Sequence, residues 1–447
     1  MSKRAHFSRR VFLKQTTQAV SAAMVAPTLL PACARGANEK IRLGFIGLGW
    51  RVNLIMEFMP KDGFEITAFS DINDSRMEAA KFNYKKVAAT YKDYRELLAS
   101  GKVDAVVIAS PDHWHALHTI DACKAGKDVY VEKPLSLTIA EGASMIKVAR
   151  STNRIVQVGI QQRSRAICMQ GCQSVLDGMI GKVTEVHGYN YPSAWDCDIT
   201  ETQEVPRSLD WDTWIGQSQP HAYHYDIYKG SFQPGNYPDG RPKGWLSYTA
   251  WSGGAMTAWG AHGFDIIAWG LGNNRPGPIE VWPEPWDEKA PIMFGDLELK
   301  DPVWKEGHAL TCPLHYKYAD GTVIHLDNKA PGFGGLFAGS DGAIMVDRDN
   351  LQIKRSGEKM TIIAGPPNDD GSTTEHLADW LACIKSRKLS RGDVEIAHGS
   401  TTMCHLGNIA RRLGRKIIWD PKTETFGDDK EANSHIRREA RKPWVVA

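Results

Sequence analysis

The residue best placed to do chemistry is a lysine, Lys133, which directly follows the apolar run at 129–131 and Glu132. A short apolar run is typical of a strand that is buried on both faces of a parallel sheet. Ligands of open α/β sheets bind at the carboxyl ends of the strands, where Lys133 would lie. Pro134 restricts the backbone at this point. We therefore predict that Lys133 is a catalytic group.

A second group of residues has the spacing of a dinucleotide site. The apolar run at 41–46 predicts a strand that leads into Gly47-Leu48-Gly49, and a helical pattern follows at 54–59. Glycines here permit a tight turn, and the amino end of the helix faces a pyrophosphate. The third glycine of the full motif is replaced by Val52, so this motif is weak by itself.

Asp71 strengthens the prediction because it ends the next predicted strand, at 66–70. It follows Gly49 by about 20 residues, the interval expected for the acid that binds the ribose hydroxyls. Its charge would repel a 2′-phosphate, so we predict NAD rather than NADP as the cofactor.

The elements that must position these residues form a βαβ series. Residues 103–135 are predicted as a strand, a helix that ends at Gly126, and a second strand. A helix at 91–98 precedes them, and a helix at 139–149 and a strand at 155–159 follow. We expect a Rossmann NAD-binding domain over 40–160. Beyond it we predict a loop-rich aromatic region to 252, strands at 184–191, 310–318, 322–327 and 343–346, helices at 374–386 and 399–413, and an irregular tail.

The amino terminus resembles a bacterial twin-arginine export signal over residues 1–34. Arg9-Arg10 is followed by Phe12-Leu13-Lys14 and a modestly apolar run. Cleavage at Ala32-Cys33-Ala34 would release a soluble protein, whereas an imperfect lipobox would place a lipid on Cys33; we favour release. We predict no membrane-spanning segment, since no other apolar run approaches about 18 residues. Twin-arginine export of a folded protein, to the periplasm or beyond, suits a chain that takes up its cofactor first.

Composition and charge exclude other classes. The formal net charge of +2 includes five basic residues among the first 34, so the remainder is slightly acidic and nucleic acid is not the expected partner. The eight cysteines form no CxxC pair. His113, His115 and His118 are close in sequence but lack the further ligands of a metal site. We predict no metal.

The chain resembles the glucose–fructose oxidoreductase/inositol dehydrogenase (Gfo/Idh/MocA) family over nearly all of its length after the signal. The marks are the Gly47/Gly49 turn, Ser110-Pro111 with His115, AGKDVYVEKPL at 125–135, Gly253-Gly254 with Gly260-Ala261-His262 and Asp265, and CHLGNIARRLGRKIIWDP at 404–421. The resemblance implies a second, α+β domain over 161–447 with a large, mostly antiparallel sheet. It also implies that the terminal helices pack back toward the Rossmann domain, and that homodimers or homotetramers form through the open sheet face.

The resemblance further implies site residues. Lys133 and His262 would be the catalytic pair, and we add Asp265 because of its spacing from His262. The expected cofactor-binding residues are Gly47, Leu48, Gly49, Trp50, Asp71, Ser110, Pro111, His115, Glu132, Lys133 and Gln161. The expected substrate-binding residues are Lys133, Arg163, Tyr191, Trp195 and His262.

The chemistry of these residue types agrees with the oxidation of a secondary alcohol. His262, with an intrinsic pKa near ~6.5, suits removal of the hydroxyl proton. Lys133 suits stabilisation of the developing alkoxide. Asp265 lies three residues from His262 on a predicted helix and is expected to orient its ring.

One position departs from the family pattern, which has an aspartate four residues before the histidine; here it is Ala258. Proton transfer then rests on His262 alone or on another side chain. We predict an NAD-dependent oxidoreductase that acts on a secondary hydroxyl of a sugar or glycoside and retains its cofactor. One alternative is a redox-neutral NAD-dependent glycosidase, although exported members with that activity lack the lysine of Glu-Lys-Pro. The other is a non-catalytic, cofactor-holding sugar-binding protein.

Overall fold

The computed structural model describes residues 40–446, with gaps at 86, 88, 198, 231–243, 274, 286–292, 295–296, 299–309 and 366–370. The predicted export signal and Cys33 lie outside the described residues. No disulfide joins the described cysteines, which are Cys123, Cys168, Cys172, Cys197, Cys312, Cys383 and Cys404. Among the described helices, none combines the length and the apolar character needed to cross a bilayer.

The first part of the chain forms a six-stranded parallel sheet in the order β3-β2-β1-β4-β5-β6, with every neighbouring pair parallel. This is the doubly wound order of a Rossmann fold, as predicted. The central strands are apolar and buried, which is why the sequence shows them as continuous runs. The strands are β1 (Ile41–Ile46), β2 (Phe64–Ser70), β3 (Ala89–Tyr91), β4 (Ala105–Ile108), β5 (Asp128–Val131) and β6 (Val156–Val158).

Helix α3 was not predicted, and two of the predicted helices differ at their starts. Helix α4 begins at Tyr94, not at Tyr91, because Tyr91 ends β3 and Asp93 caps the helix by accepting from the Arg95 amide. Helix α2 begins at Trp50, directly after the glycine turn. The helices are α2 (Trp50–Glu57), α3 (Asp74–Asn83), α4 (Tyr94–Ala99), α5 (Asp112–Lys124) and α6 (Ile139–Ser151).

The second part contains a nine-stranded sheet, mostly antiparallel, in the order β16-β15-β14-β13-β7-β12-β11-β8-β17. Strand β7, predicted as antiparallel, is antiparallel to β13 but parallel to β12. Its strands are β7 (Val183–Gly188), β8 (Glu280–Pro283), β11 (Leu314–Lys317), β12 (Val323–Leu326), β13 (Gly335–Gly339), β14 (Gly342–Val346), β15 (Asn350–Arg355), β16 (Thr361–Ala364) and β17 (Ile417–Ile418).

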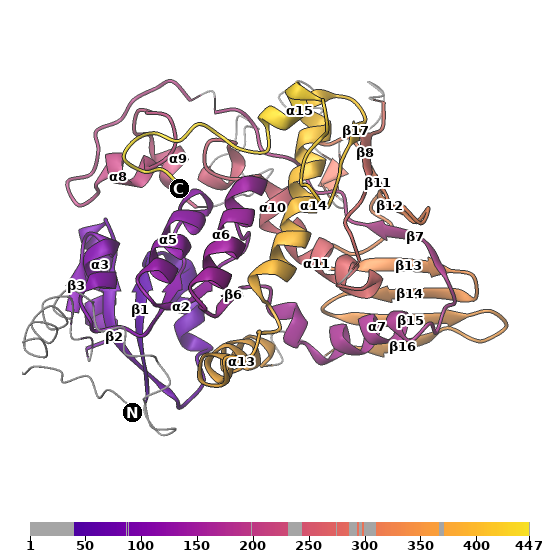
Figure 1. Cartoon of the computed structure of the whole chain (residues 1–447), viewed down its shortest axis with the longest axis horizontal. Coiled ribbons are helices and arrows are strands. Elements are labelled where there is room, and N and C mark those ends of the chain that lie inside the picture. The colour runs from indigo at the N-terminus through magenta and orange to yellow at the C-terminus, as the bar shows by residue number, and fades with distance from the viewer. Residues whose placement is uncertain are drawn as a thin grey trace, which may run out of the picture. The chain divides into compact units, whose positions relative to one another are not determined.

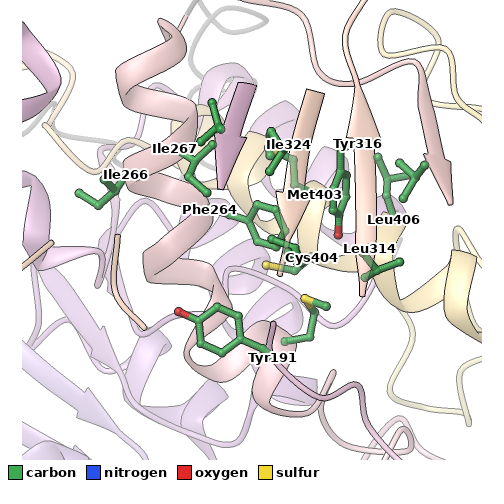
Figure 2. Close-up of a cluster of buried hydrophobic side chains, with 14 of the residues drawn as sticks. Tyr191, Phe264, Ile266, Ile267, Leu314, Tyr316, Ile324, Met403, Cys404 and Leu406 are labelled. Atoms are coloured by element: carbon green, nitrogen blue, oxygen red, sulfur yellow. The ribbon is translucent and has the colours of Figure 1, made fainter. Parts of the chain in front are cut away.

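Helices α7 (Ala166–Leu176), α11 (Gly260–Leu271) and α14 (Val394–Leu413) pack against this sheet (Figure 1). Buried apolar side chains from α11, β11 and α14 meet in its core, among them Phe264, Tyr316 and Met403 (Figure 2). Helix α11 carries His262, so this core sets the position of that ring.

Helix α13 (Ser372–Ser386) packs on the parallel sheet. Its Trp380 ring meets that of Tyr130 on β5 with centroids 5.7 Å apart. Gln157 on β6 donates its amide to the His376 carbonyl at 2.6 Å. These contacts hold the strand that ends at Glu132 and Lys133.

Candidate functional site

The glycine turn after β1 is required by the fold at its first position. Gly47 has φ +83°, and a Cβ there would lie 2.8 Å from the Ser110 amide nitrogen, so only glycine lets the turn approach the end of β4. A Cβ at Gly49 would meet only the Arg76 guanidinium, at 3.7 Å. Protein packing therefore does not demand the second glycine, whereas close approach of a ligand would.

Asp71 lies opposite this turn at the end of β2. Its carboxylate accepts from the backbone amides of Leu48 (2.6 Å) and Asn73 (2.7 Å). Burial raises its pKa, and the nearby Arg76 opposes that shift. The carboxylate is thereby fixed beside the turn, as expected for a ribose-binding acid.

A cavity of about 210 Å³ lies at the carboxyl ends of the parallel strands. Its lining includes Gly47, Gly49, Asp71, Ser110 and Pro111, so the structure brings these five predicted cofactor residues together. Leu48 contributes its amide to Asp71. Trp50 is 75% exposed and does not line this cavity.

The outer wall of the cavity comes from distant parts of the chain. Helix α8 (Trp211–Ile215) contributes Trp214, whose carbonyl accepts from the Trp114 indole at 3.0 Å. Trp444 near the carboxyl terminus packs edge-on to Trp114, with centroids 5.2 Å apart. Arg441 ties the terminal segment to α8 through the Gly216 carbonyl. This wall was not predicted from the sequence.

Lys133 lies at the end of β5, where it was predicted. Its ammonium donates to the Ala258 carbonyl at 2.7 Å. Burial lowers its pKa, and the charges of Arg51 and Arg348 add to that effect. Glu132 is paired with Arg51 at 2.8 Å, so the charge of this carboxylate acts on Arg51 as well as on Lys133.

His262 is in the first turn of α11, four residues after Ala258, and is 4% exposed. Its Nδ1 is buried without a hydrogen-bond partner. Burial lowers its pKa well below the usual value, and the positive charges of Lys133 and Arg348 lower it further. His262 is therefore held in the neutral form that can accept a proton.

The prediction that Asp265 orients the His262 ring is wrong. Both Asp265 oxygens accept from Arg163 Nε, at 2.8 and 3.0 Å, and the pair is almost fully buried. Arg163 also donates to Asn273 and stacks over Trp269, so it is not directed toward a substrate. A buried carboxylate gains more from the charged hydrogen bonds of a guanidinium than from a bond to an imidazole three residues away, and the guanidinium would be left unpaired without it.

Tyr191 is also misassigned as a substrate residue. Its ring is buried in the core cluster beside α11 (Figure 2), and its hydroxyl donates to the Gly332 carbonyl. Trp195 is half-buried and packs against the aromatic cluster around Trp251.

His115 joins two strand ends. Its Nδ1 lies 2.7 Å from the Pro134 carbonyl oxygen, and its Nε2 lies 2.9 Å from the Ser110 carbonyl oxygen. The His115 ring thus connects Ser110, which lines the cavity, to Pro134, the residue after Lys133. We therefore give His115 a positioning role. Gln161 begins the short helix that follows β6, and its Oε1 is buried without a partner.

Asp112 is a functional candidate that the sequence reasoning missed. It lies in the first turn of α5, is 3% exposed, and accepts from the Ser252 hydroxyl at 2.7 Å. Burial raises its pKa, while His115 and Lys133 oppose this. The methyl group of Ala258 is buried and offers nothing polar, so Asp112 is the carboxylate that acts on Lys133 besides Glu132. The signal in the sequence was its place directly after Ser110-Pro111.

Comparison with known proteins identifies two matching regions. Residues 41–160 match an oxidoreductase family's NAD-binding Rossmann fold, and residues 172–446 match the C-terminal alpha/beta domain of the same oxidoreductase family.

Curated relatives match part of the chain. Inositol 2-dehydrogenase of Salmonella typhimurium is 33% identical over 33% of this chain and 44% of its own length. Glycosyl hydrolase family 109 protein 1 of a Shewanella species is 36% identical over 26% of this chain and 27% of its own length. The matches thus span less than half of either relative.

Solved structures share the fold over most of the chain. Aldose-aldose oxidoreductase from Caulobacter crescentus has a TM-score of 0.58 at 15% identity, covering 85% of this chain and 100% of that one. Levoglucosan dehydrogenase in complex with NADH and levoglucosan has a TM-score of 0.57 at 15% identity, covering 85% and 99%.

Proposed function

Because the chain belongs to the GFO/IDH/MocA oxidoreductase family, we propose that it oxidises a secondary hydroxyl of a sugar or glycoside with a retained NAD. The observation that carries this proposal is the pairing of Lys133 and His262. His262 is buried and Lys133 is partly buried. The Lys133 ammonium donates to the carbonyl of Ala258, which lies four residues before His262. Strand β5, which leads to Lys133, is two positions from β1 and its Gly47 turn in the sheet.

The residues of the site fit a nicotinamide dinucleotide. Gly47, the α2 N-cap Gly49 and Asp71 line one cavity, which suits a pyrophosphate and a ribose. Bound NAD supplies the hydride acceptor. His262 takes the hydroxyl proton, since its lowered pKa keeps it neutral. Lys133 donates to the substrate oxygen as charge develops on it.

The wall formed by α8 and the terminal segment supports retention of the cofactor. Trp214 and Trp444 line the cavity from outside the parallel sheet. We propose that contacts with these two rings slow the departure of a bound dinucleotide. Retention of the cofactor would suit a protein that is exported already folded. We therefore also propose twin-arginine export to the periplasm. The alternative processing route would leave the exported protein anchored by a lipid on Cys33. Homo-oligomer formation through the open sheet face also stays a proposal.

Extensively dialysed protein is expected to turn over sugar without added NAD. The reason is that the bound nicotinamide stays in the site and is reoxidised there, either because a second substrate takes the hydride or because the hydride returns to the product. The measurement is the steady-state rate with and without free NAD, together with the nicotinamide content of the purified protein. Strict dependence on added NAD, with NADH released in proportion to product, would make the protein a conventional dehydrogenase.

A redox-neutral glycosidase is the second candidate. It is favoured by the partial similarity to the family 109 hydrolase and by the missing aspartate at Ala258. Product analysis by mass separates the two, because a glycosidase releases a free sugar at the oxidation level of the substrate. Failure to convert any sugar or glycoside would favour the binding-protein alternative.

Replacement of Asp71 by alanine is expected to weaken NAD binding by about ten- to a hundredfold and to relax discrimination against NADP. A lost charged hydrogen bond is worth about 1.5–3 kcal/mol. Asp71→Asn tests the charge alone, since an amide oxygen can still accept from the Leu48 amide. Glu78→Ala, on the exposed side of α3, serves as the control. Unchanged affinity of Asp71→Ala for both cofactors would refute the assignment.

A further inference from the structure

Arg348 is a cation beside the proposed catalytic pair that the sequence reasoning did not identify. It lies in the turn between β14 and β15, and its guanidinium carbon is 3.4 Å from the centroid of the Phe333 ring. The His262 ring meets the same Phe333, with centroids 6.1 Å apart. Phe333 therefore contacts both the arginine and the catalytic histidine.

The polar contacts of Arg348 leave part of its guanidinium unused. Nη2 donates to Gln162 Oε1 at 3.3 Å, and Nε is buried without a hydrogen-bond partner. Gln162 is itself held by donating to the Phe333 carbonyl at 2.7 Å. The side chain is thus positioned by neighbours that do not neutralise its charge.

Two other arginines near the site have carboxylate partners. Arg51 is paired with Glu132, and Arg163 with Asp265. Within the described part of the chain, Arg348 forms no ion pair. Asp347, its neighbour, uses Oδ1 to accept from the amides of Asp349 and Asn350. Asp349 acts on Arg348 through space without forming an ion pair, and a half-buried guanidinium without a paired carboxylate is costly unless a ligand supplies one.

The charge of Arg348 reaches the reacting groups. Burial is the main cause of the lowered pKa of both Lys133 and His262, and Arg348 contributes to each shift. Lys133 and Arg348 therefore present two positive charges to the same region. Glu132 and Asp112 oppose the charge of Lys133, whereas a neutral sugar would leave Arg348 without a carboxylate partner.

We propose that Arg348 binds the carboxylate of an acidic sugar, so that the substrate is a uronic or aldonic acid or a glycoside of one. Its planar fork of N–H groups suits a carboxylate, which can accept two parallel hydrogen bonds. The carboxylate takes no part in the reaction: the oxidised carbon still gives its hydride to NAD and its hydroxyl proton to His262. The inference rests on the proposed oxidoreductase function and adds the substrate class.

The test is reduction of the bound cofactor, followed by nicotinamide absorbance, with matched neutral sugars and their uronic and aldonic acids. Sulfated and phosphorylated sugars are included to distinguish other anions. The acids are expected to be bound at least about tenfold more tightly than their neutral counterparts. If a sulfate or phosphate ester is preferred and depends on Arg348, the carboxylate assignment is overturned in favour of that anion.

Arg348→Gln is expected to weaken binding of the acidic sugar by about ten- to a hundredfold while leaving NAD content unchanged. Arg348→Lys should retain part of the affinity, because it keeps the charge but loses the fork. Lys354→Gln, which removes a charge from the exposed end of β15, is the control. In Arg348→Gln the acid limb of the pH–rate profile should also move to higher pH, since a charge that lowers the His262 pKa is gone.

Equal use of neutral and acidic sugars by wild-type protein and Arg348→Gln would overturn the inference while leaving the oxidoreductase proposal standing. Loss of bound NAD in Arg348→Gln would assign the arginine to the cofactor instead. If no sugar of any charge reduces the bound cofactor, the proposed function itself fails.

Discussion

His262→Ala is expected to lower the rate of bound-cofactor reduction by about 10²–10⁴-fold, with the fold and NAD content unchanged. The physical reason is that the variant lacks the neutral imidazole that accepts the hydroxyl proton. Single-turnover kinetics with a substrate sugar provides the measurement. His325→Ala, on β12 of the nine-stranded sheet, is the control and should retain full activity. Near-full activity of His262→Ala would show that another group accepts the proton, and Asp112 would be the next residue to test.

The pH dependence of this step gives a second readout of the same site. Because burial and the Lys133 charge lower the His262 pKa, wild-type activity should persist below the pH at which an ordinary histidine becomes protonated. Removing the charge in Lys133→Met should raise the His262 pKa, so the acid limb of the residual activity should move to higher pH. A limb that does not move would show that the two groups are not coupled.

Asp265→Ala is expected to destabilise the protein by about 3–5 kcal/mol, because it leaves the buried Arg163 guanidinium without its carboxylate. The measurement is the midpoint of urea unfolding. Asp320→Ala breaks a more exposed ion pair with Arg275 and should change the stability by about 0–1 kcal/mol.

A double variant separates a structural from a catalytic role for Asp265. Arg163→Met with Asp265→Leu removes both charges and should recover much of the lost stability. If the pair is structural, turnover should recover with it. Loss of turnover in a stable double variant would indicate that the Arg163–Asp265 pair contributes to catalysis.

The local pattern of the sequence was sufficient for the parallel sheet and for the residues at its strand ends. Strands β1, β4 and β5 are short, apolar and buried on both faces, so each appears as a continuous run. Gly47, Asp71 and Lys133 follow such runs directly, and their positions depend on the chain within a few residues. The strand β3 was overlooked because its three residues are only half-buried.

The contacts of Asp265, Tyr191 and Arg348 were decided only by tertiary structure. Asp265 is three residues from His262 but binds Arg163, which is 102 residues away in the chain. Arg348 reaches the site through Phe333 on another loop, and no local periodicity marks such a contact. Spacing along a helix shows which residues share a face. Which partner a buried charge takes depends on what the packed core brings within hydrogen-bonding distance, because an unpaired charge there is too costly to leave.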